Sequence, residues 1–463
     1  MNTRRILAAG LTCALLFSCP VSALAVHKGS DGPKSAGQLD TTLITPVSRG
    51  TLSFDEIERR VLSSNLNVRT AQEGLAQAKA MNWNKVLGEM DDAIDDLEEA
   101  IDQMSGASTM DMSTAVAGIA QALAAAQAAE DATDQMAAAA ALAQGVAQIS
   151  AGTTITAYSS MQTESLKNTL ESLEDQRDDL KKQKDDYPKT IEDTERLVQS
   201  TIDQIVSGAQ SLYLTILTTQ LQADSLQDTL DATGRTVTEM ELRYSLGQIS
   251  AQTLQQVENG YGTLENSVSG LNNTLGTMRS SLQSLLGEIP DGNLVLTNTP
   301  QVTQVQLDAI RYDTDLVKAK EKSYTLYNAS RSVEKAEDEM NTARKDNGKN
   351  SYQYQMAEHA YQSAVYQNAA AVAAFELSFQ NLFRAIAPAQ ATLAVKEADL
   401  AYQEQLYATA ELKYQQGNLS ANALNEAANA RESAKRDVEA AQLDLFTAYH
   451  NYRQAVEKGV AGN

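Results

Sequence analysis

Two stretches of the chain share one pattern: LRYSLGQISAQTL at residues 242–254 and LKYQQGNLSANAL at residues 412–424. In each, a tyrosine is followed three positions later by a glycine, and three positions after that by a serine. The internal spacing is identical, and the two stretches lie 170 residues apart. The chain is therefore predicted to contain two copies of one structural unit, each reversing direction in the same way.

The pattern has a local physical explanation. Gly247 and Gly417 follow long helical patterns, and a residue that adopts the left-handed conformation at low cost ends a helix. Ser250 and Ser420 stand where a side-chain oxygen can accept from the free N–H groups of a new helix. Apolar residues just before each serine and four positions after it form a hydrophobic staple: Ile249 with Leu254, and Leu419 with Leu424. Both stretches are predicted to be tight helix-turn-helix reversals.

The first 25 residues have the features of a secretory signal peptide. Arg4 and Arg5 provide a basic start, an apolar stretch follows from Ile6 to Phe17, and small residues precede position 26. The apolar stretch is too short to span a bilayer, so cleavage and export are expected. As an alternative, Cys19 and the residues before it loosely match a lipoprotein processing site.

The composition is that of an exported, acidic, helical protein. The formal net charge of −23 becomes −25 once Arg4 and Arg5 are removed with the signal peptide, which argues against nucleic acid as a partner. Aromatic residues make up 5%, and the 463 residues include only 7 prolines, a usage that favours long helices. Cys13 and Cys19 both lie in the signal region, so the mature chain is expected to have neither disulfide nor thiol chemistry.

Pattern and composition divide the chain into segments. An extended arm or linker is expected at residues 26–50, and the first helical repeat at residues 51–289. A connector at 290–303 contains the best candidate for a strand, Leu294–Leu296, and the second repeat spans residues 304–463. The first repeat is longer by about 80 residues, which we interpret as an additional alanine-rich and coiled-coil hairpin.

Breaks within the helices are also predicted. The pattern predicts continuous helix over residues 53–71 and over residues 305–345. A turn is expected at residues 346–350, where polar residues flank a glycine. Pro188, with the tyrosine before it, is expected to stop a helix, and Pro388 to kink one.

Together these features resemble the TolC-type outer membrane efflux protein family. The resemblance rests on the signal peptide, the opening TLSFDEI at residues 51–57 with NLNV at 65–68, the twin corners and the duplicated helical hairpin. In the second copy, residues 315–317 are taken as the counterpart of the opening. The resemblance covers nearly all of the mature chain, and the twin corner is its most specific element.

The helical patterns predict an all-α fold of long antiparallel helical hairpins in two tandem repeats. The resemblance implies that this fold assembles as a homotrimer into a hollow α-barrel. In such proteins a closable tip meets a periplasmic adaptor (membrane fusion) protein and a cytoplasmic-membrane transporter, and the channel carries drugs, toxins or proteins outward. By position, the tip residues would be Arg243, Tyr244, Gly247, Ser250, Tyr414, Gly417 and Ser420. The tyrosines would contribute to closure. A simpler interpretation stays open, in which these residues only form and pack a turn.

One departure from the family stands out. Family members place two membrane-spanning strands between the long helices of each copy. At that location the second copy offers only residues 346–350, and the first copy offers alanine-rich helix around residues 114–151. Neither segment shows the alternation of a transmembrane strand, so these strands are expected to be missing or replaced.

No catalytic, metal-binding or cofactor-binding pattern is found. His27, His359 and His450 are isolated in sequence, and the last two are predicted to lie on the surface of polar helices. Nucleophile elbow, phosphate loop and HExxH patterns do not occur. The acidic run at residues 89–102 lacks the glycine-centred loop of a calcium site and is interpreted as a solvated helix face. An enzyme, a metal site and a cofactor are therefore not expected.

The competing hypothesis is a non-channel coiled-coil protein of the cell envelope, such as a spacer or an adhesin. It explains the acidity, the heptads and the missing strands equally well, but it does not predict two matching corners. The sequence thus favours a TolC-like efflux or export channel component in the cell envelope.

Overall fold

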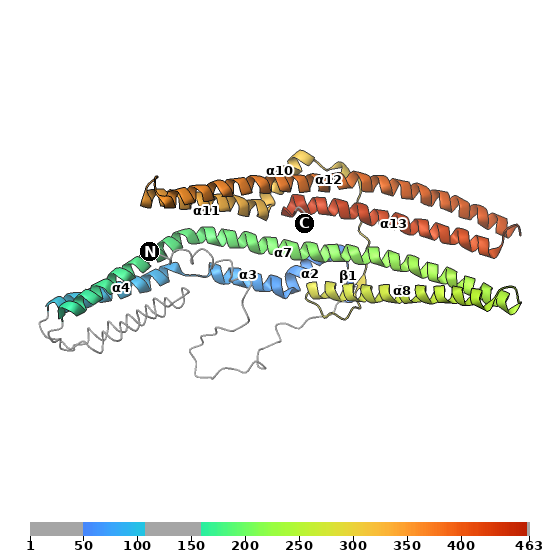
Figure 1. The fold of residues 1–463 in the computed structure, drawn as a ribbon, viewed down its shortest axis with the longest axis horizontal. Helices are drawn as coiled ribbons and strands as arrows, with labels where there is room; N and C mark the ends of the chain where they lie inside the picture. The colour runs from blue at the N-terminus through green and yellow to red at the C-terminus, as the bar shows by residue number, and fades with distance from the viewer. Residues whose placement is uncertain (1–49, 107–158, 461–463) are drawn as a thin grey trace, which may run out of the picture. The chain divides into compact units, whose positions relative to one another are not determined.

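The computed structural model describes residues 50–106 and 159–460, which are almost entirely helical (Figure 1). The all-α fold with little β-structure is therefore confirmed. The signal segment with Cys19, the arm up to residue 49 and the alanine-rich stretch lie outside the described residues. The chain divides into two compact units, of which the smaller comprises Glu73–Glu195 and the larger the remainder.

In chain order the elements are β1 (Thr51–Leu52), the 3-10 helix η2 (Phe54–Glu56), α2 (Ile57–Ser64), α3 (Leu66–Lys79), α4 (Trp83–Gly106), α7 (Ser159–Ser245), α8 (Ala251–Leu285), β2 (Val295–Leu296), α9 (Gln304–Asp308), α10 (Tyr312–Lys322), α11 (Tyr324–Asn347), α12 (Tyr352–Gln415) and α13 (Ala421–Lys458). The strands pair in parallel, with Thr51 opposite Val295. They are the only strands in the described ranges, and β2 confirms the strand predicted in the connector.

The helix expected across residues 53–71 is interrupted at Asn65. This residue has extended backbone angles, and its side-chain oxygen accepts from the N–H of Val68 at 3.0 Å. Its amide donates to the carbonyl of Leu285 at 2.7 Å. The prediction of a continuous helix was wrong because a new cap and a long-range hydrogen bond outweigh the local helical pattern.

The helix expected across residues 305–345 is three helices, α9, α10 and α11. The last break falls at Ser323, whose backbone is extended and whose hydroxyl accepts from the N–H of Leu326. Ser323 is thus the structural counterpart of Asn65. By this correspondence α10 matches α2, and residues 315–317, the predicted counterpart of the opening, lie inside α10.

A glycine at the end of a long helix packs against each break. Gly287 follows α8 with φ +71°, and Gly459 follows α13 with φ +68°. A Cβ atom on Gly287 would lie 2.1 Å from the carbonyl oxygen of Ser64, and one on Gly459 would lie 2.3 Å from the nitrogen of Ser323. We call Asn65 with Gly287 the first junction and Ser323 with Gly459 the second junction.

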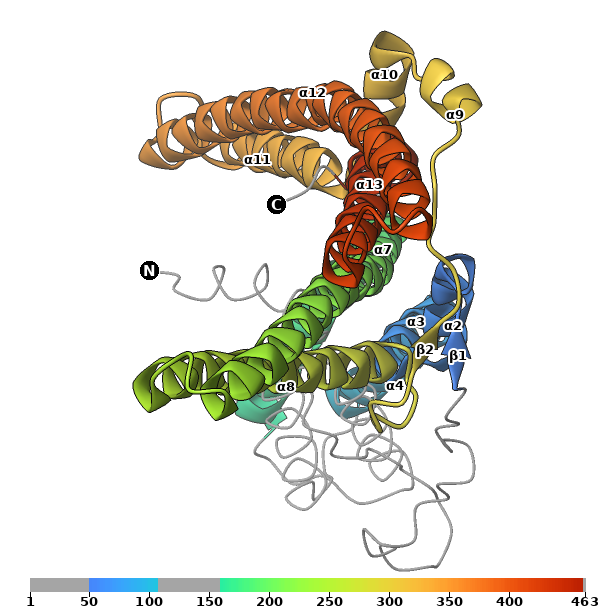
Figure 2. The ribbon, with the colours of Figure 1, turned by 90° about the vertical axis from the view of Figure 1, so that its right-hand side faces the viewer.

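Four long helices of the larger unit lie in the order α8, α7, α13, α12 (Figure 2). Arg279 on α8 donates to Gln220 on α7 at 2.8 Å. Arg436 on α13 pairs with Asp228 on α7 at 2.5 Å. The long helix α12 packs along α13 and also along α11. It contains Pro388 and is unbroken there, and the turn expected at 346–350 joins α11 to α12.

The core of the second copy lies where α10, α12 and α13 meet. Phe379 and Tyr452 are fully buried there, with ring centroids 5.2 Å apart. The Tyr452 hydroxyl donates to the buried carboxylate of Asp315 at 2.9 Å, and the Arg311 N–H donates to the same oxygen at 3.1 Å. Burial, together with this bond to a carboxylate, raises the pKa of Tyr452. The polar groups in this core are thus satisfied.

In the smaller unit, α7 runs straight through the predicted stop at Pro188. The Tyr187 hydroxyl donates to the carbonyl of Ala78, and its ring meets the Trp83 ring edge-on at a centroid distance of 5.1 Å. A proline inside a helix costs about 3 kcal/mol. The prediction of a stop was wrong because packing of the flanking residues offsets this cost.

Candidate functional site

The two corners between the long helices are the candidate functional site. Gly247 and Gly417 adopt left-handed conformations with φ +70° and +73°. In the first corner, the N–H of Gln248 donates to the carbonyl of Arg243 at 2.8 Å, and the N–H of Gly247 donates to that of Tyr244 at 2.9 Å. The second corner has the same two bonds at the same lengths, from Asn418 to Lys413 and from Gly417 to Tyr414. Both are Schellman motifs, which satisfy the last carbonyls of a helix.

Each corner also begins its next helix as predicted. The Ser250 hydroxyl accepts from the N–H of Thr253, and the Ser420 hydroxyl from the N–H of Ala423, both at 3.2 Å. Ile249 and Leu419, the predicted staple residues, are half-buried while their neighbours are exposed. The two predicted reversals are thus confirmed, down to their caps.

The corners expose apolar side chains. Leu242, Tyr244 and Leu246 at the first corner are 46% to 62% exposed, and Leu412 and Tyr414 at the second are 59% and 44% exposed. A Cβ atom on Gly247 or Gly417 would meet nothing within 4 Å. Both corners lie at the same end of the larger unit (Figure 1). The exposed apolar set is therefore free for contact with another molecule.

The charged side chains at the corners are partly neutralised locally. Arg243 pairs with Glu239 on the same helix at 2.5 Å, and both side chains are nearly half exposed. Exposed pairs of this kind contribute little to stability. The turn therefore depends on the Arg243 carbonyl and not on the Arg243 side chain.

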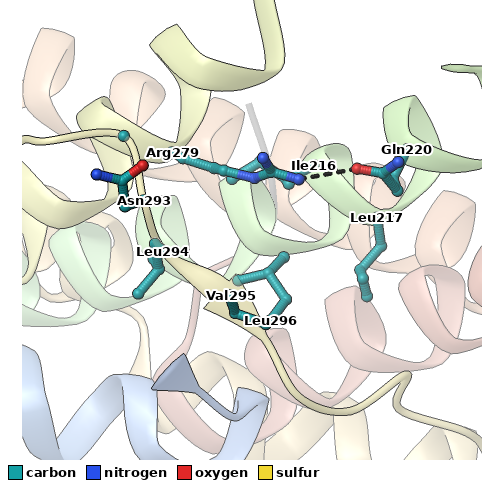
Figure 3. A pocket seen from close by; sticks show the side chains of 9 residues that line it. Ile216, Leu217, Gln220, Arg279, Asn293, Leu294, Val295 and Leu296 are labelled. Atoms are coloured by element: carbon teal, nitrogen blue, oxygen red, sulfur yellow. Dashed lines mark hydrogen bonds between the residues drawn. The ribbon is translucent and has the colours of Figure 1, made fainter. Parts of the chain in front are cut away.

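Sequence reasoning missed a pocket of about 350 Å³ beside the connector (Figure 3). Ile216 and Leu217 on α7 form one wall, and Leu294–Leu296 form the other. Arg279 reaches in from α8 and bonds to Gln220, while its Nε atom is buried without a hydrogen-bond partner within the described part of the chain. The only hint in the sequence is that Arg279 is the sole lysine or arginine between Arg243 and Arg311.

His450 was predicted to lie on the surface, and this was wrong. Its ring stacks on Phe446 at a centroid distance of 5.7 Å and meets Phe54 edge-on at 5.1 Å. Burial, with a smaller contribution from Lys458, lowers the pKa of His450 to about 4. The imidazole is therefore neutral at physiological pH and serves as a core residue.

Neither a metal-binding cluster nor a membrane-spanning helix occurs among the described residues. No group of histidine, cysteine, aspartate or glutamate side chains there is placed to hold a metal ion. No helix within residues 50–106 and 159–460 combines the length and apolar character needed to cross a membrane.

No protein-family model and no curated protein matches the sequence. Among solved structures, the chain is similar to the outer-membrane channel OprN at 13% identity and a TM-score of 0.46, covering 92% of this chain and 96% of that one. It is similar to the CmeC outer membrane channel of Campylobacter jejuni at 11% identity and a TM-score of 0.45, with 60% of this chain and 67% of that chain covered. It is also similar to the outer membrane protein VceC of Vibrio cholerae at 16% identity and a TM-score of 0.39, with 59% of this chain and 73% of that chain covered. All three are outer membrane proteins, the kind of protein that the sequence pattern resembles.

Proposed function

We propose that the chain is the channel component of a TolC-like export system in the cell envelope. Three copies would form a helical conduit, and the twin corners would dock a periplasmic adaptor protein that is linked to a cytoplasmic-membrane transporter. The observation that carries this proposal is the pair of corners. They share one backbone geometry, lie at one end of the larger unit and expose five large apolar side chains.

The corners favour a docking role over a purely structural one, because some of their exposed side chains are not needed to form the turn. Backbone hydrogen bonds and serine caps already complete both reversals. Leu242 and Leu412 take part in the turns only through their backbone carbonyls, and both residues are about 60% exposed. Exposed leucines and tyrosines on a rigid turn provide the apolar anchors that a partner's groove can bury.

Assembly is the first test of this proposal. Native mass spectrometry of the purified mature protein is expected to give three chains, and electron microscopy is expected to show a hollow ring in end-on views. A monomeric or dimeric rod would contradict the channel and would favour the envelope spacer or adhesin.

Export is the second test. In cells whose only copy carries both Leu242→Asp and Leu412→Asp, we expect loss of export of a fluorescent dye such as ethidium, with the trimer mass retained. Ser433→Asp adds a charge at an exposed position of α13 away from the corners and serves as the control. Normal export by a correctly assembled double variant would leave the corners with a turn-forming role only.

A further inference from the structure

The pocket beside the connector combines apolar walls with a single cation. Its volume of about 350 Å³ lies at the lower end of the range for small-molecule sites. Ile216 is buried and Leu217 is half-buried on one side, and Val295 on the other side is 58% exposed. Figure 3 shows the guanidinium of Arg279 in the middle of the pocket, pointing toward Gln220. We call this cavity, lined by Ile216, Leu217, Gln220, Arg279 and residues 292–296, the connector pocket.

Arg279 has no acidic partner within the described part of the chain. Its one hydrogen bond there, from Nη2 to the side-chain oxygen of Gln220 at 2.8 Å, goes to a neutral amide. The same amide donates to the exposed Asp224 at 3.0 Å, so this carboxylate is linked to Arg279 only through Gln220. The Nε–H of Arg279 is buried and unpaired, and a buried donor without an acceptor is costly. The arginine is therefore placed to receive an anion.

The acidic residues nearest to Arg279 in sequence are engaged elsewhere. Glu288 forms a buried ion pair of its own, and Asp291 accepts from the side-chain amide of Gln283 at 2.6 Å. On α8 the nearest other charge is Glu265, which lies 14 residues before Arg279 and thus about 21 Å away along the helix. These carboxylates do not neutralise Arg279, so its positive charge is available to a bound molecule.

Hydrogen bonds within the chain hold the connector wall in place. Gln283, fully buried on α8, accepts from the N–H of Gly292 at 2.8 Å. Gly292 has φ +74°, and a Cβ atom there would lie 3.3 Å from the carbonyl oxygen of Gly276, so the connector lies close against α8. Further along, the N–H of Val295 donates to the carbonyl of Gly50 at 3.0 Å. A cavity with fixed walls binds a ligand at a lower cost in entropy than one that must first be ordered.

We propose that the connector pocket binds an amphipathic carboxylate with one short hydrocarbon chain, such as a medium-chain fatty acid. The carboxylate accepts from the Arg279 guanidinium, including its unpaired Nε–H, because the two groups match in bidentate geometry. The hydrocarbon chain lies against Leu217 and removes the exposed Val295 from water. A phosphate monoester fits less well, since it would bring nearly two negative charges to one cation.

The volume of the pocket limits the length of the hydrocarbon chain. At about 30 Å³ for each water-sized group, 350 Å³ holds about a dozen non-hydrogen atoms. Octanoate, which has about ten non-hydrogen atoms, fits within this limit. For a ligand of this size the expected Kd is on the order of 1 mM. The site lies within one chain, so it does not depend on the trimer or on the docking role proposed above.

Titration of the purified mature protein with sodium octanoate, followed by saturation-transfer NMR of the ligand, tests the proposal. We expect saturable binding at one site per chain. Octan-1-ol has the same chain length without the negative charge and provides the chemical control. It is expected to bind at least about tenfold more weakly, because it lacks the charge-assisted hydrogen bonds to Arg279.

Two pairs of matched variants locate the site. Arg279→Gln is expected to weaken octanoate binding at least about tenfold, whereas Arg344→Gln removes an exposed cation of α11 and should leave the binding unchanged. Val295→Trp is expected to fill the mouth of the pocket and abolish binding. Val305→Trp is its control, because Val305 is 79% exposed and lies outside the pocket. Both tryptophans replace exposed side chains, so the fold should be retained, and circular dichroism checks this.

Three results would overturn the inference. The first is a wild-type protein without saturable octanoate binding, whether residues before Gly50, a second copy or nothing fills its pocket. The second is octan-1-ol binding as tightly as octanoate, which would leave Arg279 without a role. The third is octanoate binding that survives Arg279→Gln or Val295→Trp in a folded protein. Binding that both of these variants lose and both controls keep supports it, whatever the assembly of the chain.

Discussion

The two junctions and the two corners use glycines with nearly the same backbone conformation, and their surroundings differ completely. All four have φ between +68° and +73°. A Cβ atom at the two junctions would lie only 2.1 and 2.3 Å from the nearest backbone atom, whereas at either corner it would meet nothing within 4 Å. The junction glycines are thus fixed by packing within the chain. The corner glycines only turn the chain and leave its surface free.

The side chains show the same contrast. At the first junction, Arg60 is buried, pairs with the buried Glu288 at 3.3 Å and donates to the carbonyl of Thr51 at 2.7 Å. At the corners, leucines and tyrosines are exposed. Contacts within the chain therefore explain the buried residues at the junctions. They do not explain the exposed apolar residues at the corners, which are available to a partner.

The largest expected effect comes from alanine at the second junction. Gly459→Ala should lower the free energy of unfolding by about 4 kcal/mol or more, because Cβ would overlap the backbone of Lys322 and Ser323. Gly417→Ala should cost only about 1–2 kcal/mol, the strain of a left-handed alanine. Urea denaturation of the two variants measures the difference. Equal losses would contradict the contrast between junction and corner.

Lowering the pH should reduce the free energy of unfolding through His450, which lies near the buried end of α13. Burial lowers the pKa of this residue from 6.5 to about 4, so the unfolded chain takes up a proton first as the pH falls. Stability is then lost from about pH 6.5 down to pH 4, by about 3 kcal/mol in all. Other groups titrate in this range, so the quantity to measure is the difference between wild type and His450→Gln at pH 7 and pH 4. A parallel pH dependence in both proteins would rule out this role for His450.

Two serine caps allow a finer comparison. Ser323 caps α11 at the second junction and is 1% exposed, while Ser420 caps α13 at an exposed corner. Ser420→Ala should cost about 1 kcal/mol, the usual loss of an N-cap. Ser323→Ala should cost about 2 kcal/mol, because the Leu326 N–H would remain buried without a partner. Thermal or urea unfolding measures both, and a larger loss at Ser420 would reverse the expected order.

The smallest effect on stability is expected from the apolar corner residues. Leu412→Gln and Tyr414→Gln should each change the free energy of unfolding by less than about 0.5 kcal/mol, since both side chains are exposed. Circular dichroism during urea unfolding checks this. A loss above about 2 kcal/mol would mean that these side chains hold the turn, and the docking role would lose its support.

The corners could be predicted from the sequence because all that forms them is local. The glycine, the cap and the staple lie within 13 consecutive residues of each stretch, so spacing alone indicates the geometry. The all-α fold followed from composition and periodicity for the same reason.

The junctions could not be predicted because their partners are distant in sequence. Asn65 bonds to Leu285, and Ser323 packs against Gly459. Asn65 and Ser323 are residue types that cap helices, but serines also stand inside the neighbouring helix α2, so this local signal does not distinguish a break from a continuous helix. Pro188 shows the opposite case, in which a reliable local signal for a stop is overridden by Tyr187 packing on Trp83. His450 was misplaced because its aromatic neighbour Phe54 lies nearly 400 residues away.

The most direct test of the proposed trimeric conduit is electron microscopy of the purified mature protein. We expect end-on views with a ring of three equal parts around an empty centre. Solid rods, or particles containing one or two chains, would contradict this assembly.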